Sequence, residues 1–368
     1  MARKNVAVFA LKSLLAASPV LLLWAVIAFR PLWYSDGEIP NYRWNKDYCA
    51  QPHDNDVIVL GDSIANGAYL PDMLSERMVN LSLGGSAPMV GYHVLENYLS
   101  HNKVPNICYI SYMEVHFATG GGTYYTRLLF SRRITPKVAY EIYNKQLDFK
   151  ENPQQNNPYG NNPAETQILM LCSSPSIFLP SVKRAMYERI PPYGLREKYC
   201  KWAYQKSDLH KGSFISRNSW QNMNTQKHDA TFTVSPLQDY YYRRMIALCV
   251  SKGIQVRLVK LPVNDTFWNY TEAFMDEFEA YYNGICRDFP TVTVDWFDSY
   301  GGEYCLDSNH LNLQGAVRFC TELAARYPWD FAGDGGISER TKEALADYIE
   351  VAKDYSETVA LLKARLGE

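Results

Sequence analysis

This chain of 368 residues lacks the cysteine pairs that mark zinc sites and disulfide frameworks. Its eight cysteines are scattered, and none belongs to a Cys-x-x-Cys pair. It also lacks an excess of either charge: the net charge is −2 and 21% of the residues are charged. Nucleic-acid-binding domains carry a basic footprint, so we expect no nucleic-acid partner. The sequence indicates no metal and no cofactor.

Aromatic residues, in contrast, are abundant, with 28 tyrosines. Two interpretations are open: an aromatic surface that binds carbohydrate, or tyrosines that fill the core and loops. The length suits one large α/β domain, or a domain with a sizeable insertion.

The N-terminus is apolar with basic residues before it. Arg3 and Lys4 precede an apolar segment over 6–29, which Lys12 interrupts near its start. About 20 apolar residues cross a bilayer, and basic residues mark the cytoplasmic side. We therefore predict a cytoplasmic tip and transmembrane anchor over 1–34, with the rest extracytoplasmic, in the periplasm or at the cell surface. Cleavage of a signal peptide after Ala28 is the alternative.

Short apolar runs rich in β-branched residues alternate with helical patterns along the chain. They predict strands at 57–60, 79–83, 107–111, 254–260 and 292–296, with helices between them. Such alternation is typical of an α/β fold, a parallel sheet with helices on both faces.

This domain is predicted to span 56–330, after a polar, aromatic linker over 35–55. The alternation breaks between about 116 and 234, where loop-forming residues dominate. We interpret that part as an insertion with short helices near 135–145 and 180–188. The last segment, 331–368, has apolar residues at helical spacing and predicts a C-terminal amphipathic helix.

The chain is organised around the stretch 56–67, which contains Gly61, Asp62 and Ser63. Ser63 follows the first predicted strand and precedes a helical pattern. That turn suits a nucleophile, because backbone N–H groups and the helix dipole stabilise an oxyanion there. The glycine spacing differs from the Gly-x-Ser-x-Gly elbow of α/β-hydrolases. An ordinary Asp-Ser turn that caps a helix is the alternative.

Three more residues follow strands at the same predicted edge of the sheet. Gly84 follows the second strand, and Asp307 and His310 precede the last helix of the sheet domain. In a doubly wound sheet these loops gather at the carboxyl ends of the strands. His310 would take the proton of Ser63 and Asp307 would orient His310. The amides of Ser63 and Gly84 would bind the oxyanion. Taken singly, Gly84 also fits a turn, and Asp307 or His310 a helix cap.

In these residues the chain resembles the SGNH hydrolase superfamily. Gly61-Asp62-Ser63 matches the first block of that family, Gly84 the glycine of the second, and Asp307-x-x-His310 the fifth. The resemblance implies a three-layer, flavodoxin-like fold and covers 56 to about 326 without the insertion. The third block, Gly-x-Asn-Asp, departs: here the chain reads Ser111-Tyr-Met-Glu114 and lacks the oxyanion-hole Asn.

Within that family, the apolar N-terminus and the segments 259–264 and 310–315 are similar to those of membrane-anchored proteins that modify polysaccharides. Examples are alginate O-acetylation proteins and the teichoic-acid D-alanyl transfer protein. The similarity implies a cell-surface or exported glycan as acceptor, with the acyl donor supplied by a membrane-bound O-acyltransferase. Asp62 and Asn264 are assigned to substrate binding, with a loop-capping role as the alternative for Asn264.

The leading hypothesis is therefore an extracytoplasmic serine O-acyltransferase, of O-acetyl type, that works through Ser63, His310 and Asp307. Hydrolysis at the same residues, by a carbohydrate acetylesterase or lipase-like enzyme, is the second hypothesis. A non-catalytic glycan-binding or scaffold protein is the third.

Overall fold

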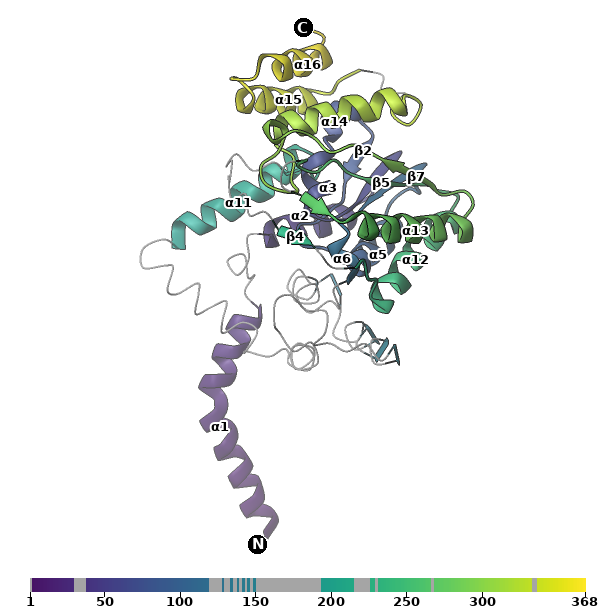
Figure 1. The fold of residues 1–368 in the computed structure, drawn as a ribbon. Helices are drawn as coiled ribbons and strands as arrows, with labels where there is room; N and C mark the ends of the chain where they lie inside the picture. Colours follow the sequence, from purple (N-terminus) through teal and green to yellow (C-terminus); the bar gives the residue numbers. More distant parts are fainter. Residues whose placement is uncertain are drawn as a thin grey trace.

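A five-stranded parallel sheet lies at the centre of the molecule (Figure 1). The computed structural model describes residues 2–29, 38–118, 193–214, 226–228, 231–265, 268–332 and 336–368, with single positions between 128 and 149. The strand order is β2-β1-β3-β5-β7, which is consistent with a flavodoxin-like arrangement. The strands are β1 (Val57–Gly61), β2 (Met78–Asn80), β3 (Ile107–Ser111), β5 (Gln255–Lys260) and β7 (Thr293–Trp296).

Side chains alternate between the two faces of this sheet, as the strand geometry requires. Ile58 and Leu60 belong to one buried cluster, and Val57 and Val59 belong to another. Both faces are covered, so β1 is apolar at every position instead of alternating with polar residues. The predicted α/β fold with a parallel sheet is confirmed.

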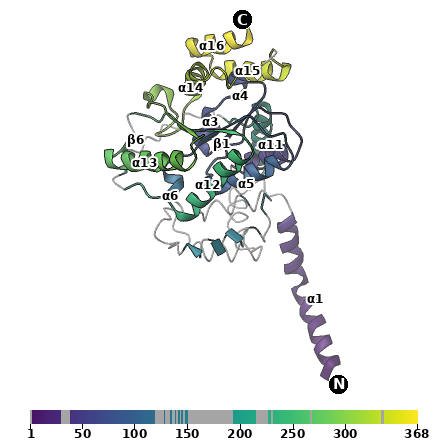
Figure 2. The ribbon, with the colours of Figure 1, turned by 90° about the vertical axis from the view of Figure 1, so that its right-hand side faces the viewer.

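Two layers of helices cover these faces (Figures 1 and 2). The first layer contains α2 (Ile39–Cys49), α5 (Pro88–Leu99), α12 (Pro236–Ser251) and α13 (Glu272–Asp288). The second contains α3 (Ser63–Ala68), α4 (Pro71–Leu74), α14 (Leu313–Arg326), α15 (Glu339–Val351) and α16 (Ser356–Leu366). Side-chain caps at Ser235, Thr271, Asn312 and Ser338 begin α12, α13, α14 and α15.

The C-terminal segment forms two helices where one amphipathic helix was expected. α15 ends at Val351 and α16 begins at Ser356. The break lets both helices bury apolar residues in the same cluster, since Leu345 of α15 and Leu362 of α16 are both fully buried there.

The predicted insertion contributes three described elements: α6 (Val115–Ala118), α11 (Tyr193–Leu209) and β4 (Gln226–His228). β4 pairs in parallel with β6 (Trp268–Tyr270) in a second, two-stranded sheet. The helix expected near 180–188 lies outside the described residues. Of the one expected near 135–145, the described positions 138, 141, 142, 144 and 145 are helical.

The prediction of a membrane anchor with an extracytoplasmic domain is wrong. Residues Ala2–Phe29 form a helix, α1, which lies away from the sheet and its covering helices (Figures 1 and 2). Within the described part of the chain, however, no helix has both the length and the apolar character needed to cross a membrane. The polar residues Lys12 and Ser13 interrupt the apolar stretch of α1, and Pro19 lies inside the helix.

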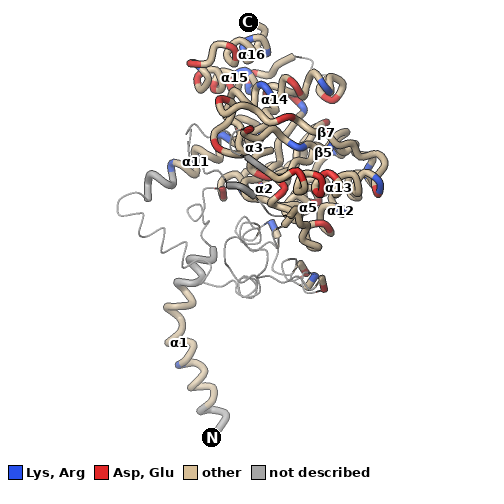
Figure 3. The backbone as a smooth tube through the Cα atoms, in the orientation of Figure 1, with Lys and Arg blue, Asp and Glu red and all other residues tan. Residues whose placement is uncertain are grey.

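Acidic and basic residues are interspersed along the chain over the sheet and helices (Figure 3). Some form pairs one helical turn apart, such as Arg318 Nε and Glu322 Oε1 at 2.8 Å on α14. Exposed pairs of this kind contribute little to stability.

Candidate active site

The turn that carries Ser63 joins β1 to α3 and is tightly constrained. A Cβ atom on Gly61 would lie 2.2 Å from the carbonyl oxygen of Ser111, so only glycine fits there. The buried carboxylate of Asp62 caps α3 by accepting from the N–H of Ile64 at 3.0 Å. Ser63 is therefore the first residue of α3, at the carboxyl edge of the sheet.

The loop that carries His310 is fixed by main-chain hydrogen bonds and by its junction with α14. The N–H of Leu306 donates to the carbonyl of His310 at 2.8 Å. Asn312 caps α14 by accepting from the N–H of Gly315 at 3.0 Å. A Cβ on Gly315 would lie 2.2 Å from the carbonyl oxygen of Tyr304. The sequence 310–315 thus holds the start of α14 against the loop.

These two loops bring Ser63, His310 and Asp307 into a hydrogen-bonded relay. Ser63 Oγ lies 2.8 Å from His310 Nε2, and His310 Nδ1 lies 2.9 Å and 3.0 Å from the two carboxylate oxygens of Asp307. The Asp307 carboxylate also accepts from the N–H groups of Asn309 and His310, at 2.9 Å and 2.8 Å. The chain thus places its three predicted catalytic residues in the order that a nucleophile, a base and an orienting acid require.

The pKa shifts of His310 and Asp307 agree with this geometry. Burial acts to lower the pKa of His310, but the hydrogen bond and charge of Asp307 outweigh it, with smaller contributions from Asp62 and Glu38, and the pKa is raised. Burial acts to raise the pKa of Asp307, but its bonds to His310 lower it. Asp307 therefore stays ionised and strengthens His310 as a base.

Neither a comparison with protein-family models nor one with curated proteins finds a match for this sequence. The resemblance to SGNH hydrolases stays a prediction.

The segment that follows β2 brings Gly84 to the same edge as Ser63. The N–H of Leu83 and the hydroxyl of Ser86 both donate to the carbonyl of Gly61, at 3.1 Å and 2.9 Å. Gly84, between them, therefore lies at the end of β1, beside the turn of Ser63. The oxyanion role of Gly84 stays a prediction.

Asp62 lies at this edge, but its side chain points into the protein. It is fully buried, and its carboxylate accepts from the N–H of Ile64 and, at 2.7 Å, from the N–H of Met113. His116 Nε2 lies 3.7 Å from the same carboxylate. In this structure Asp62 joins the end of β1 to the end of β3, and its predicted contact with substrate has no support from these contacts.

Asn264 follows β5 and bonds to the main chain of the loop that carries Asp307. Its Nδ2 donates to the carbonyl of Asp307 at 3.4 Å, and its N–H donates to the carbonyl of Ser308 at 3.2 Å. Asn264 is buried. It therefore supports the loop of Asp307 from β5, as a loop-capping Asn would.

Met113 and Glu114 take the places of Asn and Asp in the third block. Asn309 Nδ2 lies 3.0 Å from the sulfur of Met113. Glu114 is buried, and burial raises its pKa despite the opposing charge of Lys260. The hydroxyl of Tyr270 donates to it at 3.1 Å. Asn309 is an amide donor near the position of the missing Asn, and its place next to His310 was the only sequence signal for it.

Glu38 is the residue at this site that the sequence did not indicate. It is the N-cap residue of α2, in the segment that was expected to be a linker, and its carboxylate lies against Gly84.

Among the described residues, no three His, Cys, Asp or Glu side chains form a group that could hold a metal ion.

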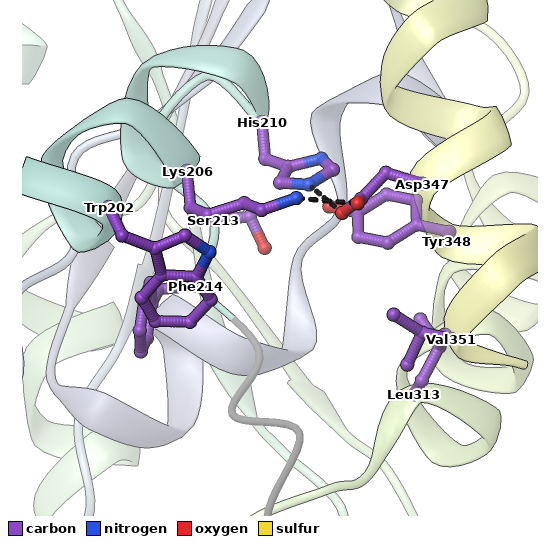
Figure 4. Close-up of a pocket in the computed structure, with 9 residues that line it drawn as sticks. All are labelled: Trp202, Lys206, His210, Ser213, Phe214, Leu313, Asp347, Tyr348 and Val351. Atoms are coloured by element: carbon purple, nitrogen blue, oxygen red, sulfur yellow. Dashed lines mark hydrogen bonds and ion pairs between the residues drawn. The ribbon is translucent and has the colours of Figure 1, made fainter. Parts of the chain in front are cut away.

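A small cavity lies between α11, the start of α14 and α15 (Figure 4). Phe214 lines it and joins it to α3, because its N–H donates to the carbonyl of Asn66 at 3.2 Å. The cavity volume is about 20 Å³, which holds about one water molecule. It is too small for a sugar or an acyl chain.

Proposed function

We propose that this protein is a serine acyl-transfer enzyme, an O-acyltransferase that moves a small acyl group onto a hydroxyl of a glycan. The observation that carries the proposal is the relay in which Ser63 Oγ lies 2.8 Å from His310 Nε2, and His310 Nδ1 lies 2.9 Å and 3.0 Å from the two carboxylate oxygens of Asp307. The resemblance of these blocks to SGNH hydrolases supports it. The donor would be an acyl ester, supplied in similar systems by a membrane-bound O-acyltransferase.

In the first step the Oγ of Ser63 attacks the carbonyl carbon of the donor while Nε2 of His310 takes the hydroxyl proton. The amides of Ser63 and Gly84 face the oxygen that becomes negative. The C–O bond to the leaving group then breaks, and His310 gives its proton to that oxygen. An ester on Ser63 is left.

In the second step a glycan hydroxyl attacks this ester. His310 takes the proton of the hydroxyl and returns it to Ser63 Oγ as the acyl group leaves. Asp307 stabilises the imidazolium that forms twice in the cycle. The acyl group is then an ester of the glycan, and the enzyme is restored.

The replacement of the third-block Asn by Met113 favours transfer over hydrolysis. Loss of one oxyanion donor typically costs about 100- to 1000-fold in rate. Such a site reacts poorly with small esters and gains most from a large substrate whose remote contacts contribute to the transition state. Hydrolysis by an esterase with the same three residues is the second candidate. A scaffold protein that binds glycans without reacting is the third.

Transfer and hydrolysis are distinguished by adding an acceptor. We predict slow turnover of a chromogenic acetyl ester in water, and faster ester consumption when a suitable oligosaccharide is present. Mass spectrometry should then detect acylated oligosaccharide with the wild-type chain but not with Ser63→Ala. Fast hydrolysis that no sugar changes, with no acylated product, would make the protein an esterase.

A further inference from the structure

The carboxylate of Glu38 lies against Gly84, the predicted oxyanion donor. A Cβ atom built on Gly84 would lie 2.0 Å from Glu38 Oε2 and 2.8 Å from Oε1, so the two residues are in direct contact. This contact requires glycine at position 84. It gives Gly84 a second constraint, besides the one expected from the SGNH resemblance.

The position of Glu38 follows from how α2 is held. Asn45 of α2 donates through Nδ2 to the carbonyl of Leu81 at 2.9 Å, which fixes the helix on the segment that leads to Gly84. Trp44 Nε1 donates to Asp208 Oδ1 at 3.0 Å and fixes α2 on α11. Glu38 occupies the N-cap position of α2, but its side chain makes no capping bond to that helix. The carboxylate is directed to Gly84 instead.

The charge of this carboxylate acts on the pKa of His310. Glu38 is among the charges that raise the pKa of His310, after the larger effects of burial and Asp307. The contact with Gly84 and this effect on His310 indicate that the carboxylate lies near both the predicted oxyanion donor and the predicted base.

We propose that Glu38 is a specificity-determining residue, which occupies the oxyanion side of the site and has to be displaced before an acyl carbonyl can bind. This inference rests on the proposed function. A carboxylate in that place repels the oxyanion that forms on the substrate and fills part of its volume. A small ester has little binding energy with which to displace it, whereas a donor or glycan with remote contacts has more. Glu38 therefore suppresses reaction with small esters.

The test uses the full chain with Glu38→Ala and Glu38→Gln. If Glu38 leaves the site open in a tenth of the molecules or fewer, Glu38→Ala should raise kcat/KM for a chromogenic acetyl ester at least about 10-fold. Glu38→Gln should also raise it, because a neutral amide accepts hydrogen bonds more weakly than a carboxylate. The rise should be smaller than with alanine, because the glutamine side chain still fills the place. Glu279→Ala, at an exposed carboxylate on α13, is the matched control and should change nothing.

A second measurement does not depend on turnover. In the chain with ¹³C-labelled histidine, NMR titration should show a lower pKa for His310 in both Glu38 variants than in the wild type. An unchanged pKa would overturn the inference, since Glu38 would then not face the site.

The remaining outcomes separate this inference from the proposed function. Ester turnover that depends on Ser63 but is equal in wild type and Glu38→Ala overturns the inference alone. Turnover that Glu38→Ala lowers and Glu38→Gln retains also overturns it, because Glu38 would then assist the reaction. Absence of Ser63-dependent turnover in every variant, with or without glycan, contradicts the proposed function and the inference with it.

Discussion

At the scale of single residues, the site depends on a hydrogen bond between two side chains that are far apart in the sequence. His310 and Ser63 are 247 positions apart, and their side chains meet at 2.8 Å. The residue types and their blocks could be read from the sequence, because nucleophile, base and acid each need a specific side chain. Glu38 could not be read in this way, since nothing local indicates that a residue at the start of α2 contacts Gly84.

The raised pKa of His310 gives a prediction about pH. The base works only when it is neutral, so the rate should fall as the pH drops through the pKa of His310. That acid limb should lie above 6.5, the ordinary value for histidine. Asp307→Asn removes the largest contribution that raises the pKa, so its limb should move to lower pH. The rate on the plateau should fall by about 10⁴-fold.

The measurement is kcat/KM for an acetyl ester between pH 5 and 9, in wild type and Asp307→Asn. His101→Gln, at an exposed histidine, is the control and should leave the profile unchanged. An acid limb that does not move in Asp307→Asn would contradict the role of Asp307.

At the scale of elements, the strands and most helices follow from local patterns. Apolar runs rich in β-branched residues predicted all five strands of the main sheet, and helical patterns between them predicted helices there. The start of α3 at Ser63 did not follow, because the cap comes from Asp62, whose second bond is to Met113 on a different loop. The strand order likewise depends on pairings between distant segments.

A buried histidine that directly follows α11, His210, contacts both α4 and α15. Figure 4 shows its contact with Asp347 of α15. Nδ1 of His210 lies 3.3 Å from Asp72 Oδ2, and Nε2 lies 3.0 Å from Asp347 Oδ2. Its ring stacks on Tyr348 with centroids 4.2 Å apart. With a carboxylate at each nitrogen, the doubly protonated ring is the form that bonds to both.

Stability should therefore depend on pH with a defined sign. Burial acts to lower the pKa of His210, but its bonds to Asp347 and Asp72 raise it. A raised folded-state pKa stabilises fully below 6.5, the ordinary value, and the effect is lost as the pH rises through the folded-state pKa. The pKa of Asp347 is lowered, mainly by His210. Its contribution is present above 3.8 and is lost as the pH falls through its folded-state value.

His210→Gln should lower the free energy of unfolding by about 3 kcal/mol near pH 6, because it leaves Asp72 buried without its main partner. The difference from wild type should shrink above the folded-state pKa of His210. Urea unfolding of the full chain at pH 6 and pH 9 measures this. A deficit that is the same at both pH values would show that the packing of the ring, and not its charge, stabilises the three helices.

At the scale of the whole molecule, the apolar N-terminal run was misinterpreted. The prediction of a membrane span relied on the number of apolar residues in this segment, but Lys12, Ser13 and Pro19 lie inside the same helix. Within the described residues, no helix meets the requirements for a membrane span. The sheet was predictable because its signal repeats in every strand. The geometry of the candidate active site is created only when two distant loops meet at one edge of that sheet.

The central claim is that Ser63 is a nucleophile activated by His310 and Asp307. The most direct test treats the full chain with a serine-directed fluorophosphonate probe and maps the labelled peptide by mass spectrometry. We predict labelling at Ser63 in wild type, none in Ser63→Ala, and wild-type labelling in the control Ser251→Ala, whose serine is exposed on α12. Equal labelling of wild type and Ser63→Ala would contradict the claim.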